Sequence, residues 1–82
     1  MKINHNLAIS DSGFLFNPGT GESFTANPMA AKIIGLLKEG KTEAQVIEHI
    51  TGQYAIDKNT FEKDLHEFNG MLRMHQLLEK DE

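Results

Sequence analysis

Cysteine and tryptophan are absent from this 82-residue sequence, and only two prolines occur. Without cysteine the chain can form neither a disulfide framework nor a thiolate metal site, which fits a reducing cytoplasm. No apolar run approaches the roughly 20 residues of a membrane-spanning helix. The N-terminal residues also lack the basic-then-apolar profile of a signal peptide. We therefore expect a soluble, cytoplasmic chain without a membrane partner.

Positive charge is scarce as well: 8 Lys and Arg stand against 12 Asp and Glu, for a formal net charge of −4. This balance opposes binding to a phosphate backbone, so nucleic acid is a disfavoured partner. The four histidines are too scattered for a metal-ligand spacing, and no serine lies in a nucleophile elbow. We expect no metal, no cofactor and no catalytic residue, and hence not an enzyme. A domain this small favours a shallow surface site.

The first 27 residues carry strand and turn signals. Alternating apolar residues separated by glycine-containing turns predict three short antiparallel strands, at about residues 7–10, 13–17 and 21–26. Phe14, Phe16 and Phe24 alternate at a spacing typical of core packing. Because no basic residue lies between them, core packing is favoured over a base-stacking sheet.

The rest of the chain carries helix signals. Side chains suited to N-caps stand at Asn27, Thr42 and Asp57, and Gly40 and Gly52 end the first two helices. The third helix has the strongest periodicity, with large apolar residues at spacings of four, three and four: Phe61, Leu65, Phe68 and Leu72. The order predicts an α+β fold, a three-stranded antiparallel meander followed by three helices, similar to a winged helix.

We expect a single domain over residues 1–82, with a core from about 7 to 78 and an acidic tail at 79–82. In a simple meander the third strand is a sheet edge, yet it has no lysine, proline or bulge to protect it. Two explanations are open at this point. An extended peptide completes the edge by strand addition, or a loop or the acidic tail covers it.

Taken whole, the chain resembles the PqqD-like peptide chaperones, the small domains also called RiPP recognition elements, over about 70 residues. The resemblance rests on the order and spacing of these segments: Leu7-Ala8-Ile9-Ser10, Gly13-Phe14-Leu15-Phe16-Asn17-Pro18, Thr25-Ala26-Asn27-Pro28, Leu37-Lys38-Glu39-Gly40-Lys41-Thr42, and Asp64-Leu65-His66-Glu67-Phe68 before Leu77-Leu78. Two positions depart from the family pattern. Gln76 stands where a glycine or small residue is frequent, and Glu39 where aspartate is common.

The resemblance implies that the domain binds the leader segment of a ribosomally made precursor peptide by strand addition. It would present this peptide to a modifying enzyme, typically a radical SAM protein, to which the catalysis would belong. The peptide-binding residues that the resemblance implies lie on the third strand and third helix: Glu22, Ser23, Phe24, Thr25, Ala26, Asp64, Leu65, Phe68, Asn69 and Leu72.

Two other functions are considered beside peptide binding, a winged-helix nucleic-acid-binding regulator and a plain dimerisation module. The acidic third helix disfavours the first of these, because it carries more carboxylates than cations. Glu62, Asp64 and Glu67 on this helix are interpreted as a solvated acidic face. In a peptide-binding domain, that face would favour a leader carrying Lys or Arg.

Overall fold

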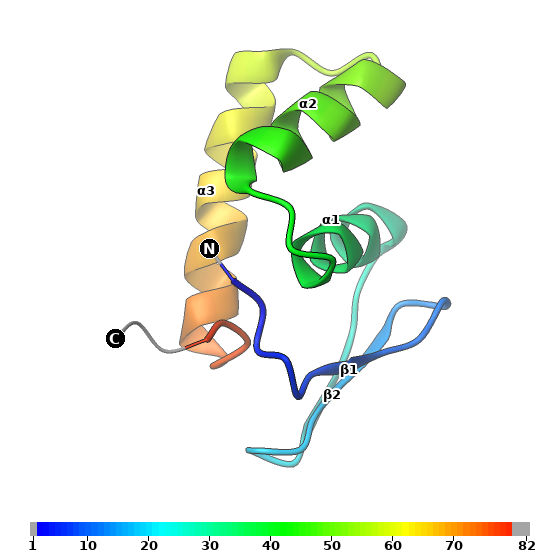
Figure 1. The fold of residues 1–82 in the computed structure, drawn as a ribbon, viewed down its shortest axis with the longest axis vertical. Coiled ribbons are helices and arrows are strands. Elements are labelled where there is room, and N and C mark those ends of the chain that lie inside the picture. The colour runs from blue at the N-terminus through cyan, green and yellow to red at the C-terminus, as the bar shows by residue number, and fades with distance from the viewer. Residues whose placement is uncertain (1, 80–82) are drawn as a thin grey trace.

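The computed structural model describes residues 2–79 and consists of a three-stranded antiparallel sheet followed by three helices (Figure 1). The strands, in the order in which they pair, are β1 (Ala8–Ile9), β2 (Phe14–Asn17) and β3 (Glu22–Thr25). The helices are α1 (Pro28–Lys38), α2 (Glu43–Gln53) and α3 (Lys58–Met74). The predicted α+β fold is thus confirmed. Of the predicted acidic tail, only Glu79 lies within the described residues.

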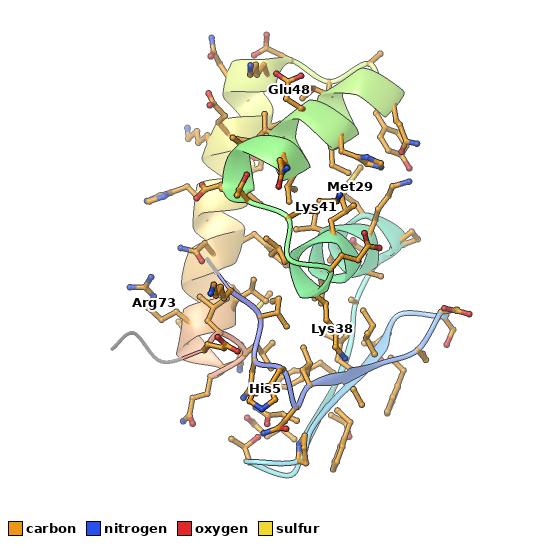
Figure 2. The ribbon with its side chains drawn as sticks, in the orientation of Figure 1. His5, Met29, Lys38, Lys41, Glu48 and Arg73 are labelled. Carbon is orange, nitrogen blue, oxygen red and sulfur yellow. The ribbon has the colours of Figure 1, made fainter. Side chains whose placement is uncertain are left out.

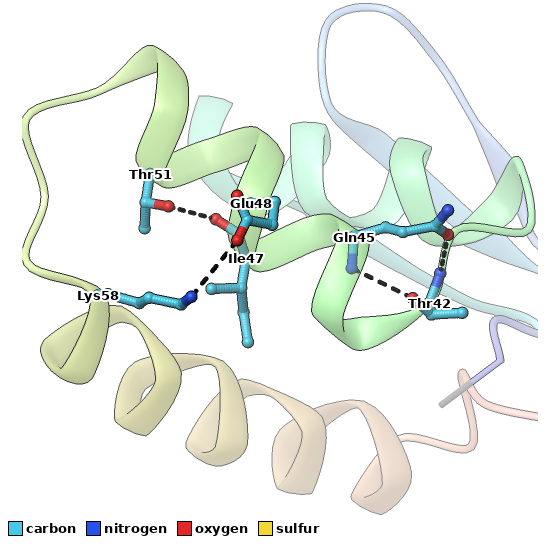
Figure 3. Close-up of polar contacts among 6 residues, drawn as sticks. All are labelled: Thr42, Gln45, Ile47, Glu48, Thr51 and Lys58. Carbon is cyan, nitrogen blue, oxygen red and sulfur yellow. Dashed lines mark hydrogen bonds and ion pairs between the residues drawn. The ribbon is translucent and has the colours of Figure 1, made fainter.

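Each helix begins at a predicted capping residue. The carboxamide of Asn27 and the carboxylate of Asp57 each accept a hydrogen bond from the backbone N–H three residues on, at 2.8 and 3.0 Å. Thr42 and Gln45 form a reciprocal capping box (Figure 3), with the Gln45 N–H donating to Thr42 Oγ1 at 3.1 Å and the Thr42 N–H to Gln45 Oε1 at 2.8 Å. Such caps contribute about 1 kcal/mol each.

α1 and α3 end in the same way, with one residue in the left-handed region. Gly40 has φ +93° after α1, and Gln76 has φ +59° after α3. Beyond α3, the Leu77 N–H closes the turn by donating to the Leu72 carbonyl at 2.9 Å. A side chain in this conformation costs about 1–2 kcal/mol. This cost is a physical reason for the small residue that the family pattern has at the position of Gln76.

The core lies between one face of the sheet and the helices. Its buried apolar residues come from all three helices, from β2 and from both terminal segments: Ile3, Leu7, Leu15, Ile33, Ile34, Leu36, Leu37, Val46, Ile47, Ile50, Phe61, Leu65, Leu72 and Leu77. In Figure 1 the helices all lie on one side of the sheet. Within residues 2–79, no helix combines the length and the apolar character needed to cross a membrane.

The face of β2 that packs against the helices is the opposite of the one predicted. Leu15 pairs with Ile9 and Phe24 on the covered face, so Phe14 and Phe16 lie on the outer face, 51% and 39% exposed. The prediction that these two phenylalanines pack in the core is wrong, whereas Phe24 does pack against it. Strand alternation determines which residues share a face, but not which face the helices cover.

The C-terminal end of α3 is tied to the sheet and to the N-terminal segment. Asn17, a buried polar residue at the end of β2, donates from Nδ2 to the Gln76 carbonyl at 3.3 Å. Its Oδ1 accepts from the Gly19 N–H at 2.9 Å. On the other side, Ile3 forms an antiparallel bridge with Leu78. These contacts fix the position of α3 beside the sheet.

Candidate functional site

The outer edge of β3 is open. The Ala26 N–H donates to the Gly13 carbonyl at 2.8 Å, which orients the Ala26 backbone toward β2. Since the N–H and C=O groups of an antiparallel strand point to alternate sides residue by residue, Ser23 and Thr25 direct theirs away from β2. Among the described residues, no hydrogen bond reaches the backbone of Ser23 or Thr25 from that side.

The two edges of the sheet differ. β1 has only two residues, and the ammonium group of Lys38 donates to the carbonyl of Leu7, just before β1. Figure 2 shows Lys38 extending from α1 toward this strand. By contrast, no loop within residues 2–79 hydrogen-bonds to the open side of β3, and the Glu79 N–H donates to the Lys2 carbonyl at 2.8 Å instead of to β3. The β3 edge is therefore the one available for a further strand.

Four side chains at helical spacing, three on α3 and one at its C-cap, form a row on the side of the helix where His75 meets β3. The ring of Phe24 meets the ring of His75 edge-on, with centroids 5.0 Å apart and planes at 65°. His75 follows Asp64, Phe68 and Met71 at helical spacings of four, three and four, so the four residues share one flank of the helix. We call the open edge of β3, Phe24 and this row the β3–α3 surface.

The other predicted helix residues lie elsewhere. Leu65 and Leu72 are buried in the core, 1% and 0% exposed, so they support the β3–α3 surface from beneath. Asn69 is about 100° around the helix from Phe68, on another flank. Its Oδ1 atom is buried and makes no hydrogen bond among the described residues. Of the predicted helix residues, Asp64 and Phe68 belong to the row.

Two members of the row were not predicted, Met71 and His75. Met71 and His75 lie three and seven residues after Phe68, and this helical spacing is the signal in the sequence from which they could have been predicted. On the strand, Glu22 and Ala26 flank the open positions: the Ala26 N–H donates to the Gly13 carbonyl, and the Glu22 N–H donates to Thr20 Oγ1 at 3.3 Å. Ser23 and Thr25 supply the free backbone groups at the edge.

Only two of the three carboxylates predicted to form an acidic face are neighbours on α3. Asp64 and Glu67 are three residues apart and therefore neighbours on the helix surface, whereas Glu62 lies about 200° around the axis from Asp64. Arg73 points away from the sheet in Figure 2. The row thus carries one carboxylate, Asp64, with Glu67 next to it on the helix surface, and the guanidinium group of Arg73 projects elsewhere.

The chemistry of the described residues suits binding. No group of three or more His, Asp or Glu side chains within residues 2–79 could hold a metal ion. The β3–α3 surface contains backbone donors and acceptors, apolar side chains and the Asp64 carboxylate, which are the parts needed to pair with an extended chain and hold its side chains.

The fold and this surface define a small α+β domain, similar to a winged helix, whose third strand is left open beside its last helix. The family model of coenzyme PQQ synthesis protein D (PqqD) matches residues 13–78. The chain therefore belongs to the PqqD family, and the resemblance seen in the sequence is confirmed. A solved structure of TbiB1 in complex with the TbiA(beta) leader peptide is 32% identical, with a TM-score of 0.88, and the match covers 100% of this chain and 99% of that one. None of the curated proteins matched significantly.

Proposed function

We propose that the chain binds the leader segment of a ribosomally synthesised precursor peptide, by strand addition to β3, and presents it to a modifying enzyme. The observation that carries this proposal is the open edge, where the backbone groups of Ser23 and Thr25 have no partner among residues 2–79. The similarity to TbiB1, whose structure contains a leader peptide, supports it.

Affinity and selectivity come from different parts of the surface. Ser23 and Thr25 each offer one N–H and one C=O group, and each hydrogen bond that a peptide makes there contributes about 1 kcal/mol net. Alternate residues of an added strand face the helix, where Phe24, Phe68 and Met71 provide an apolar surface. Asp64 lies at the end of the row and favours a leader with Lys or Arg beside its apolar anchor.

We infer that the chain itself catalyses nothing and that chemistry belongs to the enzyme that receives the peptide. The absence of a metal-binding cluster within residues 2–79 supports this inference. A radical SAM protein is the partner that the family resemblance implies, and the cytoplasmic location expected from the lack of cysteine is part of the same proposal. Genes for a short peptide and for such an enzyme beside this gene would identify both partners.

The proposal is tested with peptides selected from a random 12-residue display library against the whole chain. Amide hydrogen exchange is then followed by NMR in the free and peptide-bound protein. In the free protein the Phe24 amide is protected by β2, and the Ser23 and Thr25 amides exchange rapidly. Binding by strand addition slows exchange at Ser23 and Thr25. Failure to enrich any peptide, or protection confined to other elements, contradicts the proposal.

A further inference from the structure

The helices leave one face of the sheet uncovered (Figure 1). The register places two aromatic rings on this face. Phe14 and Phe16 are 51% and 39% exposed. In the register, Phe16 lies opposite Ser23 and Phe14 opposite Thr25, so both rings have a small β3 side chain beside them. A leader that contacts the α3 row touches the opposite face of the sheet. Those contacts therefore do not explain why Phe14 and Phe16 are exposed.

The size of this apolar surface limits what it can bind. An aromatic residue has roughly 200 Å² of surface, so the two rings together expose on the order of 180 Å². A stable protein–protein interface buries about 800 Å² per partner. The neighbour of Phe16 on its other side is Ala8, which adds little. The patch is therefore too small for a second copy of the chain and suits one or two side chains of a peptide.

Strand geometry places such side chains there. A leader residue directly opposite Ser23 or Thr25 has its side chain on the same, outer face of the sheet. Neighbouring strands are about 4.8 Å apart, so the leader lies roughly 10 Å from β2. A large side chain that leans across the small Ser23 or Thr25 side chain meets the Phe16 or Phe14 ring.

We propose that the leader is held on both faces of the sheet, and that Phe14 and Phe16 select large apolar side chains at two leader positions separated by one residue. The residue between those positions faces the α3 row. This inference rests on the proposed function, because it requires a strand added to β3. It predicts a recognised segment with apolar residues at consecutive positions, instead of the alternating pattern of a strand bound through one face only.

The test uses the whole chain with Phe14→Thr and Phe16→Thr, singly and together, because threonine keeps the β-propensity of these exposed positions. Tyr54→Thr is the matched control, since it removes a similarly exposed aromatic ring from the α2–α3 connection. Peptides are selected from the same 12-residue library against the parent and the double variant. Dissociation constants are then measured, together with alanine substitutions along the selected peptide.

We expect the double variant to bind the parent-selected peptide about tenfold more weakly, equivalent to losing roughly 55 Å² of apolar contact. The Tyr54→Thr control should bind it as the parent does. Alanine at the two outward peptide positions should weaken binding to the parent but not to the variant, a coupling that a general loss of stability does not produce. Thermal unfolding is measured to check that each variant is folded. If the double variant does not fold, the peptide affinities of the single variants decide the question.

Three results would overturn the inference. Unchanged affinity and unchanged peptide selection in the folded variants would show that the rings take no part, while leaving strand addition at β3 intact. Self-association of the parent chain that these substitutions abolish would assign the rings to a second copy. Failure of the parent to enrich any peptide would overturn the proposed function as well.

Discussion

Proline substitutions along β3 test strand addition most directly, because the structure assigns each backbone group to one side of the strand. The N–H groups of Ser23 and Thr25 face the open edge, and that of Phe24 faces β2. Proline removes the N–H donor at its position and is tolerated on edge strands where that donor faces solvent. We expect Ser23→Pro and Thr25→Pro to fold and to bind peptide poorly, and Phe24→Pro to damage the fold.

Proline variants at the open positions and at Phe24 should differ in how much stability and how much peptide affinity they lose. Proline at Ser23 or Thr25 breaks no hydrogen bond to β2, so the free energy of unfolding should change by less than about 1 kcal/mol. It strands one carbonyl of the bound peptide, which costs about 1–3 kcal/mol of binding, or roughly 5- to 150-fold in Kd. Phe24→Pro breaks a bond to β2 and removes a half-buried ring, for a loss of about 3–5 kcal/mol. A chain of this length has about 4–12 kcal/mol of stability in total.

Thermal unfolding and peptide affinity are measured for each variant, with a library-selected peptide. Ser23→Ala is the matched control at the edge, since it keeps the backbone N–H and should bind as the parent does. Phe24→Ala separates loss of the ring from loss of the backbone bond. If Ser23→Pro and Thr25→Pro remain folded and bind peptide as tightly as the parent, strand addition at this edge is wrong.

Three further variants test the fold and the charge of the site. Gln76→Gly should raise the free energy of unfolding by about 1 kcal/mol in denaturant titrations, because it relieves the left-handed backbone strain, and unchanged stability would argue against strain there. Gly13→Ala should lower it by at least about 2 kcal/mol, since Gly13 has φ +89° and a Cβ atom would lie 2.6 Å from the Ala26 carbonyl oxygen; a stable variant would contradict this geometry. Asp64→Asn combined with Glu67→Gln should slow association of a Lys- or Arg-bearing peptide in stopped-flow experiments and reduce its salt dependence, at about 0–1 kcal/mol per pair. Parent binding that is insensitive to salt would show that these carboxylates do not attract the peptide.

Local chemistry explains why the helix boundaries could be predicted from the sequence. A capping side chain bonds to a backbone N–H only three residues away, so Asn27, Thr42 and Asp57 determine helix starts without information from distant parts of the chain. The same holds for Gly40, whose conformational freedom allows the turn that ends α1. The order of elements, and hence the fold class, followed from these signals.

The faces of the elements could not be predicted in the same way. In β2, both alternating sets contain large apolar residues, Leu15 on one side and Phe14 and Phe16 on the other, so periodicity alone does not identify the buried set. Only packing against the helices decides it. Strand alternation places the polar residue Asn17 on the inner face with Leu15, and its buried amide donates to a carbonyl 59 residues away, a contact with no local signal in the sequence.

For α3, the sequence does not show how the helix is rotated about its own axis relative to the sheet. The apolar periodicity identifies the stripe that the core buries, which includes Leu65 and Leu72. The flank that accompanies β3 depends on how the helix lies against the sheet, and the contact between Phe24 and His75 reveals it. A prediction based on the buried stripe therefore finds the support of the site, and misses the exposed Met71 and the half-buried His75 beside it.

The contacts that hold α3 also bear on how the site would bind an extended peptide. Asn17 joins the end of β2 to the residue that terminates α3, and Ile3 pairs with Leu78 just beyond it. The strand and the helix that form the two sides of the β3–α3 surface are therefore fixed relative to each other before any peptide arrives. Binding then orders the peptide but leaves the domain largely unchanged, so the entropic cost falls on the peptide alone. A surface of this kind can accept different leader sequences, provided that each offers a free backbone and suitable side chains at the positions that contact the domain.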